Sequence, residues 1–434
     1  MSEPREPQSR EADLEPIIGH APNGSREAAI DASRDAPPAK SLSNPEQGWA
    51  PIGTTLWLFV TAGILVVGQM YVALPMLTQM AASLGTTPGT LTGTATVFGF
   101  AYALGFLFGG PMADRFGPRT MIMAGLCTTG LLTAAIAAAP TGAILIVMRG
   151  VQGFCAAMFL PSALSYVTAR IRPQARVLLV SCVTTSAFAA AIVLQTFGQL
   201  MVGSFGWRVV FLISGAMIAM LGIAASFTMQ RTERFSSNGL TAAFRAMPSL
   251  LARPAMLLLY LASFVLLGAF AAMYVAIAVA GPVEVVGSPA TLLALRLSGL
   301  PAMIAIPLLA PVMKRLPALA RVLSGLVGGS AAAAAAALLS GSAVQLGLVL
   351  LVFLAALVMA APALVEMIAT GAPDNPGVAT ALYGFAMFLG ASVGSQLVGS
   401  SGLAFGPLQL WIAASLFTGA GMVAVSSRLV GATR

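Results

Sequence analysis

Long apolar runs recur along most of this chain of 434 residues and constrain its fold more than any other feature. An apolar run of about 20 residues has the length that crosses a bilayer as an α-helix. The runs do not alternate apolar and polar residues, as the strands of membrane β-barrels do. The sequence therefore predicts an all-α polytopic membrane protein with twelve transmembrane helices, near 54–75, 91–112, 119–139, 142–168, 177–203, 208–228, 255–280, 290–312, 318–339, 343–367, 377–399 and 405–427.

Composition supports this class, since 58% of the residues are hydrophobic and only 8% are charged. Soluble proteins carry about 25% charged residues. The net charge of +8 could suit nucleic acid, but in a membrane protein it reflects Lys and Arg kept in cytoplasmic loops, and no nucleic-acid partner is predicted. Cys127, Cys155 and Cys182 all lie in apolar runs without metal or disulfide spacing, so we expect neither a metal nor a cofactor.

Residues 1 to about 50 differ from everything that follows them. They hold nine acids and five bases, many Pro, Ser and Ala, and almost no bulky apolar residues. This composition is typical of a disordered tail, and it lacks the apolar stretch of a signal peptide. The only histidine, His20, lies here, which excludes a buried histidine proton relay.

The two halves of the apolar region repeat at an offset of 200 residues, as Pro111 with Pro311 and Pro173 with Pro373 illustrate. Two six-span halves in parallel repeat are a known transporter layout. The predicted domains are a cytoplasmic tail (1–50), an N-terminal six-helix half (51–228), a cytoplasmic linker (229–254) and a C-terminal six-helix half (255–434).

Basic residues predict the orientation, because cytoplasmic loops carry an excess of Lys and Arg. With both termini in the cytoplasm, the inner loops hold most of the basic residues, and the outer loops hold little beyond Arg208. The inner set comprises Arg115, Arg119, Arg170, Arg172, Arg176, Arg231, Arg234, Arg245, Arg253, Lys314, Arg315 and Arg321. We therefore expect a protein of the bacterial cytoplasmic (inner) membrane.

The densest charge cluster near the second span lies in the stretch from Gly109 to Arg119, which predicts a tight turn between two spans. Its Gly110, Asp114, Arg115, Gly117 and Arg119 resemble the loop between the second and third spans of major facilitator superfamily transporters. Pro118 stands where the family usually has a basic residue. The resemblance implies a conformational switch in which the carboxylate contacts the other half.

For Asp114, the expected partner is the N-terminus of the eleventh span near Gly377, which supplies free N–H groups and a positive dipole end. The simpler alternative for the whole stretch is a positively charged cytoplasmic turn.

Arg149, Gly150, Val151, Gln152 and Gly153 resemble the superfamily's Arg-x-x-Gln-Gly motif. An isolated Arg is costly inside a membrane, so it must face the bundle interior or a watery cavity. Two interpretations remain open: a polar centre for proton coupling or substrate, and a structural clamp on carbonyls of the first span.

The fifth span departs from the family's efflux antiporters, which usually carry Gly-Pro-x-x-Gly-Gly there. Here only Gly198 of that motif survives. Gln195 and Gln199 are four residues apart and share a helix face, where they line the cavity or hydrogen-bond to a neighbouring helix.

Intramembrane charges favour a neutral or anionic substrate, because Arg149 and Arg296 are both positive. Arg296 could instead pair with Glu284. The residues predicted to form the substrate or proton pathway are Gln69, Tyr71, Arg149, Gln152, Gln195, Gln199, Tyr274, Arg296 and Glu366.

Within the family, the sequence resembles the 12-span drug/proton antiporter branch. This resemblance implies a secondary transporter that exports a small organic molecule in exchange for protons. We expect it to act as a monomer. Uptake of a metabolite or organic anion is the alternative within transport. A membrane receptor or enzyme is a remote alternative, and no Walker loop, His-rich metal motif or Ser nucleophile motif occurs. No catalytic residues are therefore predicted, and the energy must come from a gradient.

Overall fold

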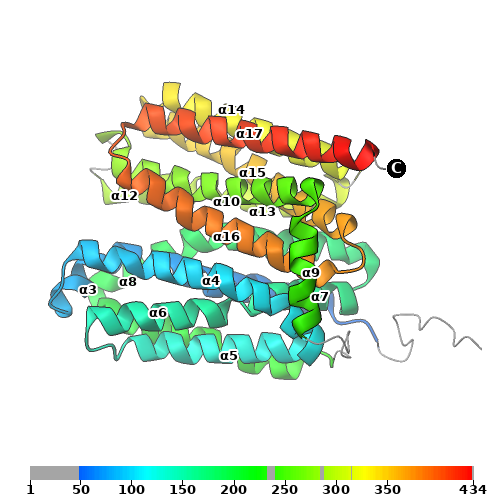
Figure 1. Ribbon diagram of the computed structural model, residues 1–434. Coiled ribbons are helices and arrows are strands. Elements are labelled where there is room, and N and C mark those ends of the chain that lie inside the picture. Colours follow the sequence, from blue (N-terminus) through cyan, green and yellow to red (C-terminus); the bar gives the residue numbers. More distant parts are fainter. Residues whose placement is uncertain (1–47, 232–239, 284–287, 314, 433–434) are drawn as a thin grey trace, which may run out of the picture. The chain divides into compact units, whose positions relative to one another are not determined.

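The structure is a computed structural model that describes residues 48–231, 240–283, 288–313 and 315–432, so the predicted tail and Glu284 lie outside the described residues. Every regular element in this part of the chain is helical (Figure 1). The elements are α2 (Ile52–Val72), η1 (Leu74–Met76), α3 (Leu77–Ser83), α4 (Pro88–Phe116), α5 (Pro118–Ile136), α6 (Gly142–Ala156), α7 (Phe159–Arg170), α8 (Pro173–Thr228), α9 (Leu240–Leu251), α10 (Pro254–Ala280), α12 (Pro289–Leu297), α13 (Leu300–Met313), α14 (Ala318–Leu338), α15 (Ala343–Gly371), α16 (Pro376–Ser400) and α17 (Phe405–Ala432).

The helices account for twelve membrane crossings, as the sequence predicts. In the described residues, 11 helical segments are long and apolar enough to span, and one of them, α8, has 56 residues. A continuous helix of that length would measure roughly 84 Å, against a hydrocarbon core of about 30 Å. Gly206 interrupts α8 with φ 77° and ψ 161°, a conformation that favours glycine, so α8 consists of two spans.

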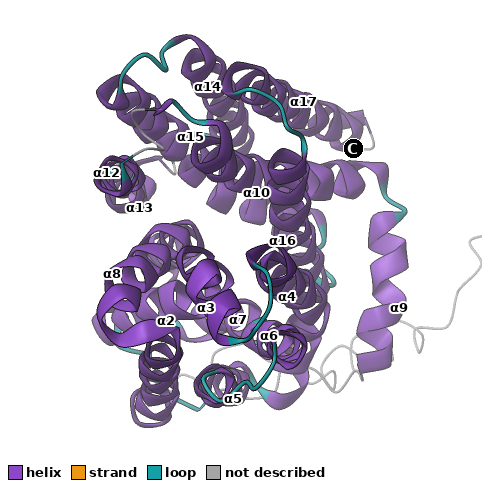
Figure 2. Ribbon diagram, turned by 90° about the vertical axis from the view of Figure 1, so that its left-hand side faces the viewer, coloured by secondary structure: helices purple, strands orange, loops and turns teal. Residues whose placement is uncertain are grey.

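The spanning helices form two groups, which Figure 2 shows nearly end-on. The first helix group contains α2 to α8, and the second helix group contains α10 to α17. Helices α4 and α16 lie side by side where the groups meet. Corresponding helices in the two groups begin about 200 residues apart. For example, α5 begins at residue 118 and α14 at residue 318, which matches the offset of the sequence repeat.

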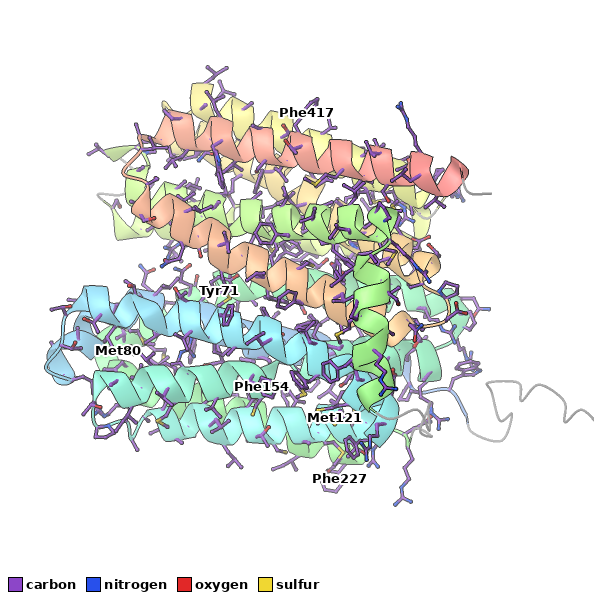
Figure 3. All side chains as sticks on the ribbon, viewed as in Figure 1. Tyr71, Met80, Met121, Phe154, Phe227 and Phe417 are labelled. Atoms are coloured by element: carbon purple, nitrogen blue, oxygen red, sulfur yellow. The ribbon has the colours of Figure 1, made fainter. Side chains whose placement is uncertain are left out.

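The outer surface of the bundle is apolar. Phe227 on α8 and Phe417 on α17 are 85% and 65% exposed, and both project outward in Figure 3. Exposed apolar side chains on this scale mark a surface that meets another apolar medium, which for helices of this length is lipid.

Helix α9 lies within the predicted linker and was missed by the sequence analysis. Its Phe244, Met247 and Leu250 recur every three residues and form one apolar side of the helix. The Phe244 ring lies 5.0 Å from that of Phe108 on α4, while Met247 and Leu250 are buried. Helix α9 contacts α10 and α16 as well as α4, so it touches both helix groups.

Candidate functional site

The motif from Gly110 to Arg119 forms the turn between α4 and α5, at an end of the bundle that we call the loop end. Gly117 is the one residue between these helices, and its φ of 88° explains the glycine. Its N–H donates to the Ala113 carbonyl at 2.9 Å. Pro118 occupies the first position of α5, where its fixed φ suits the helix and its missing N–H costs nothing.

The same motif brings α4 against the start of α16. A Cβ atom on Gly110 would lie 2.7 Å from the Gly377 carbonyl oxygen, and a Cβ on Gly377 would collide with the Asp114 carboxylate. Asp114 therefore touches the first turn of α16, where the sequence analysis expected its partner. No hydrogen bond or ion pair of this carboxylate occurs within the described ranges, so the contact is one of charge with a helix N-terminus.

The other charged residues of the motif act within the first helix group or face outward. Arg119 donates from Nη2 to the Ser226 carbonyl at 2.6 Å and so joins the start of α5 to the end of α8. Arg115 is exposed, with its guanidinium 5.3 Å from the centre of the Phe116 ring.

Aromatic packing continues the contact between α4 and α16 toward the opposite end. The Tyr102 and Phe388 rings are 4.5 Å apart, and those of Phe106 and Phe388 are 5.3 Å apart. The Phe106 ring lies directly against Gly384 of α16, where there is no room for a side chain. Sequence analysis missed this cluster, because aromatic residues in apolar runs give no functional signal.

Arg149 lies at the centre of a buried polar network in the first helix group. It is fully buried on α6 and donates from Nη2 to the Gln69 carbonyl of α2 at 2.5 Å and from Nη1 to Gln152 Oε1 at 2.6 Å. Gln152 Nε2 donates to Thr133 Oγ1 of α5 at 2.6 Å and lies 3.4 Å from Gln69 Oε1. The network thus joins three predicted pathway residues on two helices. It also includes Thr133, which could not be predicted from the sequence because a single hydroxyl in an apolar run does not indicate a functional site.

The Arg149 charge is held by aromatic rings and carbonyls. Its guanidinium lies 4.5 Å from the centre of the Phe98 ring and 5.8 Å from that of Phe211. No carboxylate within the described ranges pairs with it. The hydrogen bond to the α2 carbonyl is what a structural clamp requires. The side-chain amides and the Thr133 hydroxyl around it also fit a polar centre, so the contacts agree with both interpretations.

A second polar cluster lies between the helix groups near the end opposite the loop end. Arg296 on α12 donates from Nη1 to Gln199 Oε1 on α8 at 3.3 Å. Tyr274 on α10 lies close enough to Arg296 to interact electrostatically, and its buried hydroxyl has no hydrogen-bond partner in the described part of the chain. This cluster unites three predicted pathway residues from both groups.

Three predicted pathway residues stand outside these clusters. Gln195 and Tyr71 are half buried and make no hydrogen bond within the described residues. Figure 3 shows Tyr71 at the level where the two helix groups meet. Glu366 is 48% exposed and pairs with Arg321 of α14 at 2.5 Å near the loop end, away from the other candidates.

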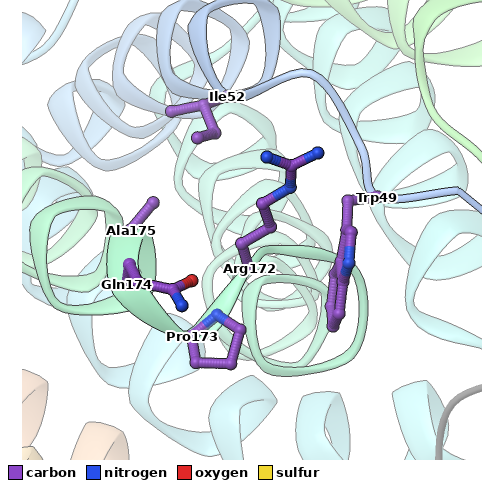
Figure 4. A pocket seen from close by; sticks show the side chains of 6 residues that line it. All are labelled: Trp49, Ile52, Arg172, Pro173, Gln174 and Ala175. Carbon is purple, nitrogen blue, oxygen red and sulfur yellow. The ribbon is translucent and has the colours of Figure 1, made fainter.

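A hollow of about 520 Å³ lies at the starts of α2 and α8, close to the loop end (Figure 4). Its lining comes from the first helix group and the residues just before α2, and no residue that the structure describes in the second helix group contributes to it. The lining residues are Trp49, Ile52, Arg172, Pro173, Gln174 and Ala175.

The helices and the polar clusters buried among them define a polytopic helical membrane protein. The sequence matches the family model described as Major Facilitator Superfamily over residues 59–395, which is most of the chain. The chain therefore belongs to the major facilitator superfamily.

Curated relatives share shorter stretches with this chain. A methylenomycin A resistance protein of Streptomyces coelicolor is 32% identical over 166 residues, which cover 36% of this chain and 34% of that protein. A multidrug resistance protein B homolog of Mycobacterium tuberculosis is 27% identical over 226 residues, covering 49% and 42%. A niacin transporter of Acinetobacter baylyi is 31% identical over 179 residues, covering 38% of each chain. The matched stretches thus span less than half of these relatives.

Proposed function

We propose that the protein is a secondary transporter that exports a small neutral or anionic organic molecule in exchange for protons. Family membership carries the proposal, and relatives named for drug resistance favour export. Uptake is the second candidate, favoured by the niacin transporter among the relatives. On this proposal the chain is no enzyme, and it works as a monomer in the bacterial inner membrane with both termini in the cytoplasm.

The mechanism we propose is alternating access, in which the first and second helix groups move against each other. The groups meet through side-chain packing along α4 and α16, and glycines let these helices approach closely at the loop end. Asp114 against α16 and Arg296 against Gln199 place one polar contact between the groups near each end. Contacts that hold in one state and break in the other are what a two-state switch requires.

Within this mechanism, Arg149 with Gln152 and Gln69 supplies the polar centre beside the pathway. Tyr71 and Gln195 are assigned to the pathway lining. The ion pair of Glu366 with Arg321 gives it a structural role near the loop end instead.

Transport by purified protein in proteoliposomes tests the proposal. A panel of neutral, anionic and cationic compounds is offered with and without an imposed pH gradient. We expect flux of at least one neutral or anionic compound that follows the gradient and stops when an ionophore collapses it. Flux of cations alone would contradict the substrate class, and flux that ignores the gradient would contradict proton exchange.

A further inference from the structure

The cluster of Arg296, Tyr274 and Gln199 is separate from the Arg149 network and joins residues of both helix groups. The bond of 3.3 Å between Arg296 Nη1 and Gln199 Oε1 is its direct link between the groups. We propose that this cluster binds the carboxylate of the transported compound, and that the bound carboxylate replaces the Arg296–Gln199 bond. The inference rests on the proposed transport function and narrows its substrate to carboxylic acids.

Arg296 has the charge and the free donors that such a site needs. Its side chain is 9% exposed, and it forms no ion pair with a carboxylate that the structure describes. Among the described residues, its one hydrogen bond goes to a neutral amide. A guanidinium carries five donors in a planar fork that matches a carboxylate with two parallel hydrogen bonds. A carboxylate is therefore the ligand that would satisfy both its charge and its geometry.

Tyr274 supplies a further donor nearby, since a Cβ on Gly299, three residues after Arg296, would lie 3.5 Å from its hydroxyl oxygen. Its hydroxyl is buried, has no hydrogen-bond partner in the described part of the chain, and belongs to a side chain that interacts electrostatically with Arg296. Buried hydroxyls are normally paired, because leaving one unpaired costs free energy. A carboxylate bound to Arg296 would accept its hydrogen bond. The unpaired hydroxyl thus leaves a hydrogen-bond donor available to a carboxylate bound at Arg296.

Gln199 links carboxylate binding to movement of the two helix groups, because its bond to Arg296 joins the groups and is replaced when the carboxylate binds. Its amide carries both an acceptor and a donor, and the acceptor now receives the Arg296 hydrogen bond. When a carboxylate binds Arg296, the amide N–H₂ of Gln199 can donate to the same carboxylate. The bond lies seven residues, or about 10 Å, inside the start of α12, so the ligand would be held within the apolar region.

Matched pairs of acid and amide test the site, because each pair differs in charge and hardly in shape. The pairs are nicotinate with nicotinamide, benzoate with benzamide, and 2-naphthoate with 2-naphthamide. Binding to the purified full-length protein is measured from the ligand-dependent rise of the thermal unfolding midpoint. We expect at least one acid to bind about tenfold or more tightly than its amide, since hydrogen bonds to charged groups are the stronger ones.

Four variants assign that preference to the cluster. Arg296→Gln should abolish it, Arg296→Lys should keep part of it, and Tyr274→Phe should weaken acid binding severalfold. Tyr260→Phe is the matched control, because Tyr260 is on the same helix and its buried hydroxyl is also unpaired, but it lies near Arg253 at the loop end. It should leave the preference unchanged.

Several results would overturn the proposal. These are equal binding of acid and amide, an acid preference that survives in Arg296→Gln, or no binding of any acid. Acid binding that emerges only in Glu284→Gln would show that Glu284 occupies Arg296, which also overturns it. Export that is unaffected by Arg296→Gln would refute the carboxylate site but would not refute the transport function. Acid binding at the cluster without any flux would refute the transport function but would not refute the carboxylate site.

Discussion

The carboxylate of Asp114 lies against Gly377, with no room for a side chain on the glycine. These residues belong to different helix groups, and Gly377 is in the first turn of α16, where free N–H groups give the helix a positive end. The contact therefore joins the groups electrostatically at the loop end, and Asp114 forms no ion pair with any residue that the structure describes. A partly buried charge near a helix N-terminus contributes up to about 2 kcal/mol.

Loss of that charge should open the loop end. A contact of about 2 kcal/mol shifts a two-state population roughly thirtyfold, so Asp114→Asn should favour the state in which the loop end is open. We expect turnover to slow more than substrate binding weakens. Flux and binding affinity, measured on the same preparation, check this. Lost affinity at unchanged turnover would make Asp114 a binding residue and refute its role as a switch.

Gly377→Ala should act in the same direction by a steric route, because its methyl group would meet the Asp114 carboxylate. Gly421→Ala on α17 is the control, since nothing lies within 4 Å of a Cβ there. We expect reduced flux in the first variant and normal flux in the second. Equal flux in both would show that the close approach of α4 and α16 is dispensable.

The Arg149 network predicts a difference between Arg149→Lys and the wild type at equal net charge. Lys is a point charge and cannot reproduce the fork that holds Gln69 and Gln152 together. Each buried polar group left unpaired costs about 1–3 kcal/mol. We expect a folded but less heat-stable protein with strongly reduced flux, measured by thermal unfolding and transport. Full flux at lowered stability would leave Arg149 as a clamp alone.

Gly206 predicts a purely conformational cost. Its φ of 77° is unfavourable for a residue with a side chain, while nothing lies within 4 Å of a Cβ at this position. This φ and ψ lie in a region that is essentially restricted to glycine, so Gly206→Ala should destabilise the protein by about 1–3 kcal/mol. Gly203→Ala, three residues earlier in the helical part of α8 and equally open, should be neutral or stabilising. Thermal unfolding of the two variants compares them, and equal midpoints would contradict the division of α8 at Gly206.

Topology can be tested at two exposed positions in a variant without the native cysteines. Thr120 is at the loop end and Ala290 is at the opposite end. Since basic loops predict a cytoplasmic loop end, Ala290→Cys should react with an impermeant reagent in intact cells and Thr120→Cys should not. The reverse pattern would invert the proposed orientation.

The sequence predicted the helices well because length and apolar content determine a membrane span almost alone. The boundary between the fifth and sixth spans was also predictable, although α8 runs through it with only Gly206 out of helical geometry. Helix α9 was missed because its 12 residues are too few to cross a bilayer and basic residues lie within and beside it. The role of its apolar side is clear only from the structure, in which Phe244 packs against Phe108 of α4.

Candidate site residues could be chosen from the sequence where a residue type is costly in lipid. Arg149 and Arg296 stood out for that reason, and Asp114 stood out through its motif. Their partners were harder to predict, because contacts such as Arg296 with Gln199 join helices that are far apart in sequence. Arg321, the partner of Glu366, was counted only as a loop charge, although the two residues form an ion pair.

In alternating access, one end of the protein opens while the other end closes. Distances between spin labels at each end measure this change most directly. In a variant without the native cysteines, one pair is placed at Thr120 and Thr370 for the loop end, and another at Ser204 and Ala290 for the opposite end. All four positions are exposed.

We predict two distance populations for each pair. Asp114→Asn, or a transported compound with a pH gradient, should lengthen the loop-end distance and shorten the distance at the opposite end. One unchanging distance at both ends, in the wild type and in Asp114→Asn, would contradict alternating access of the two helix groups.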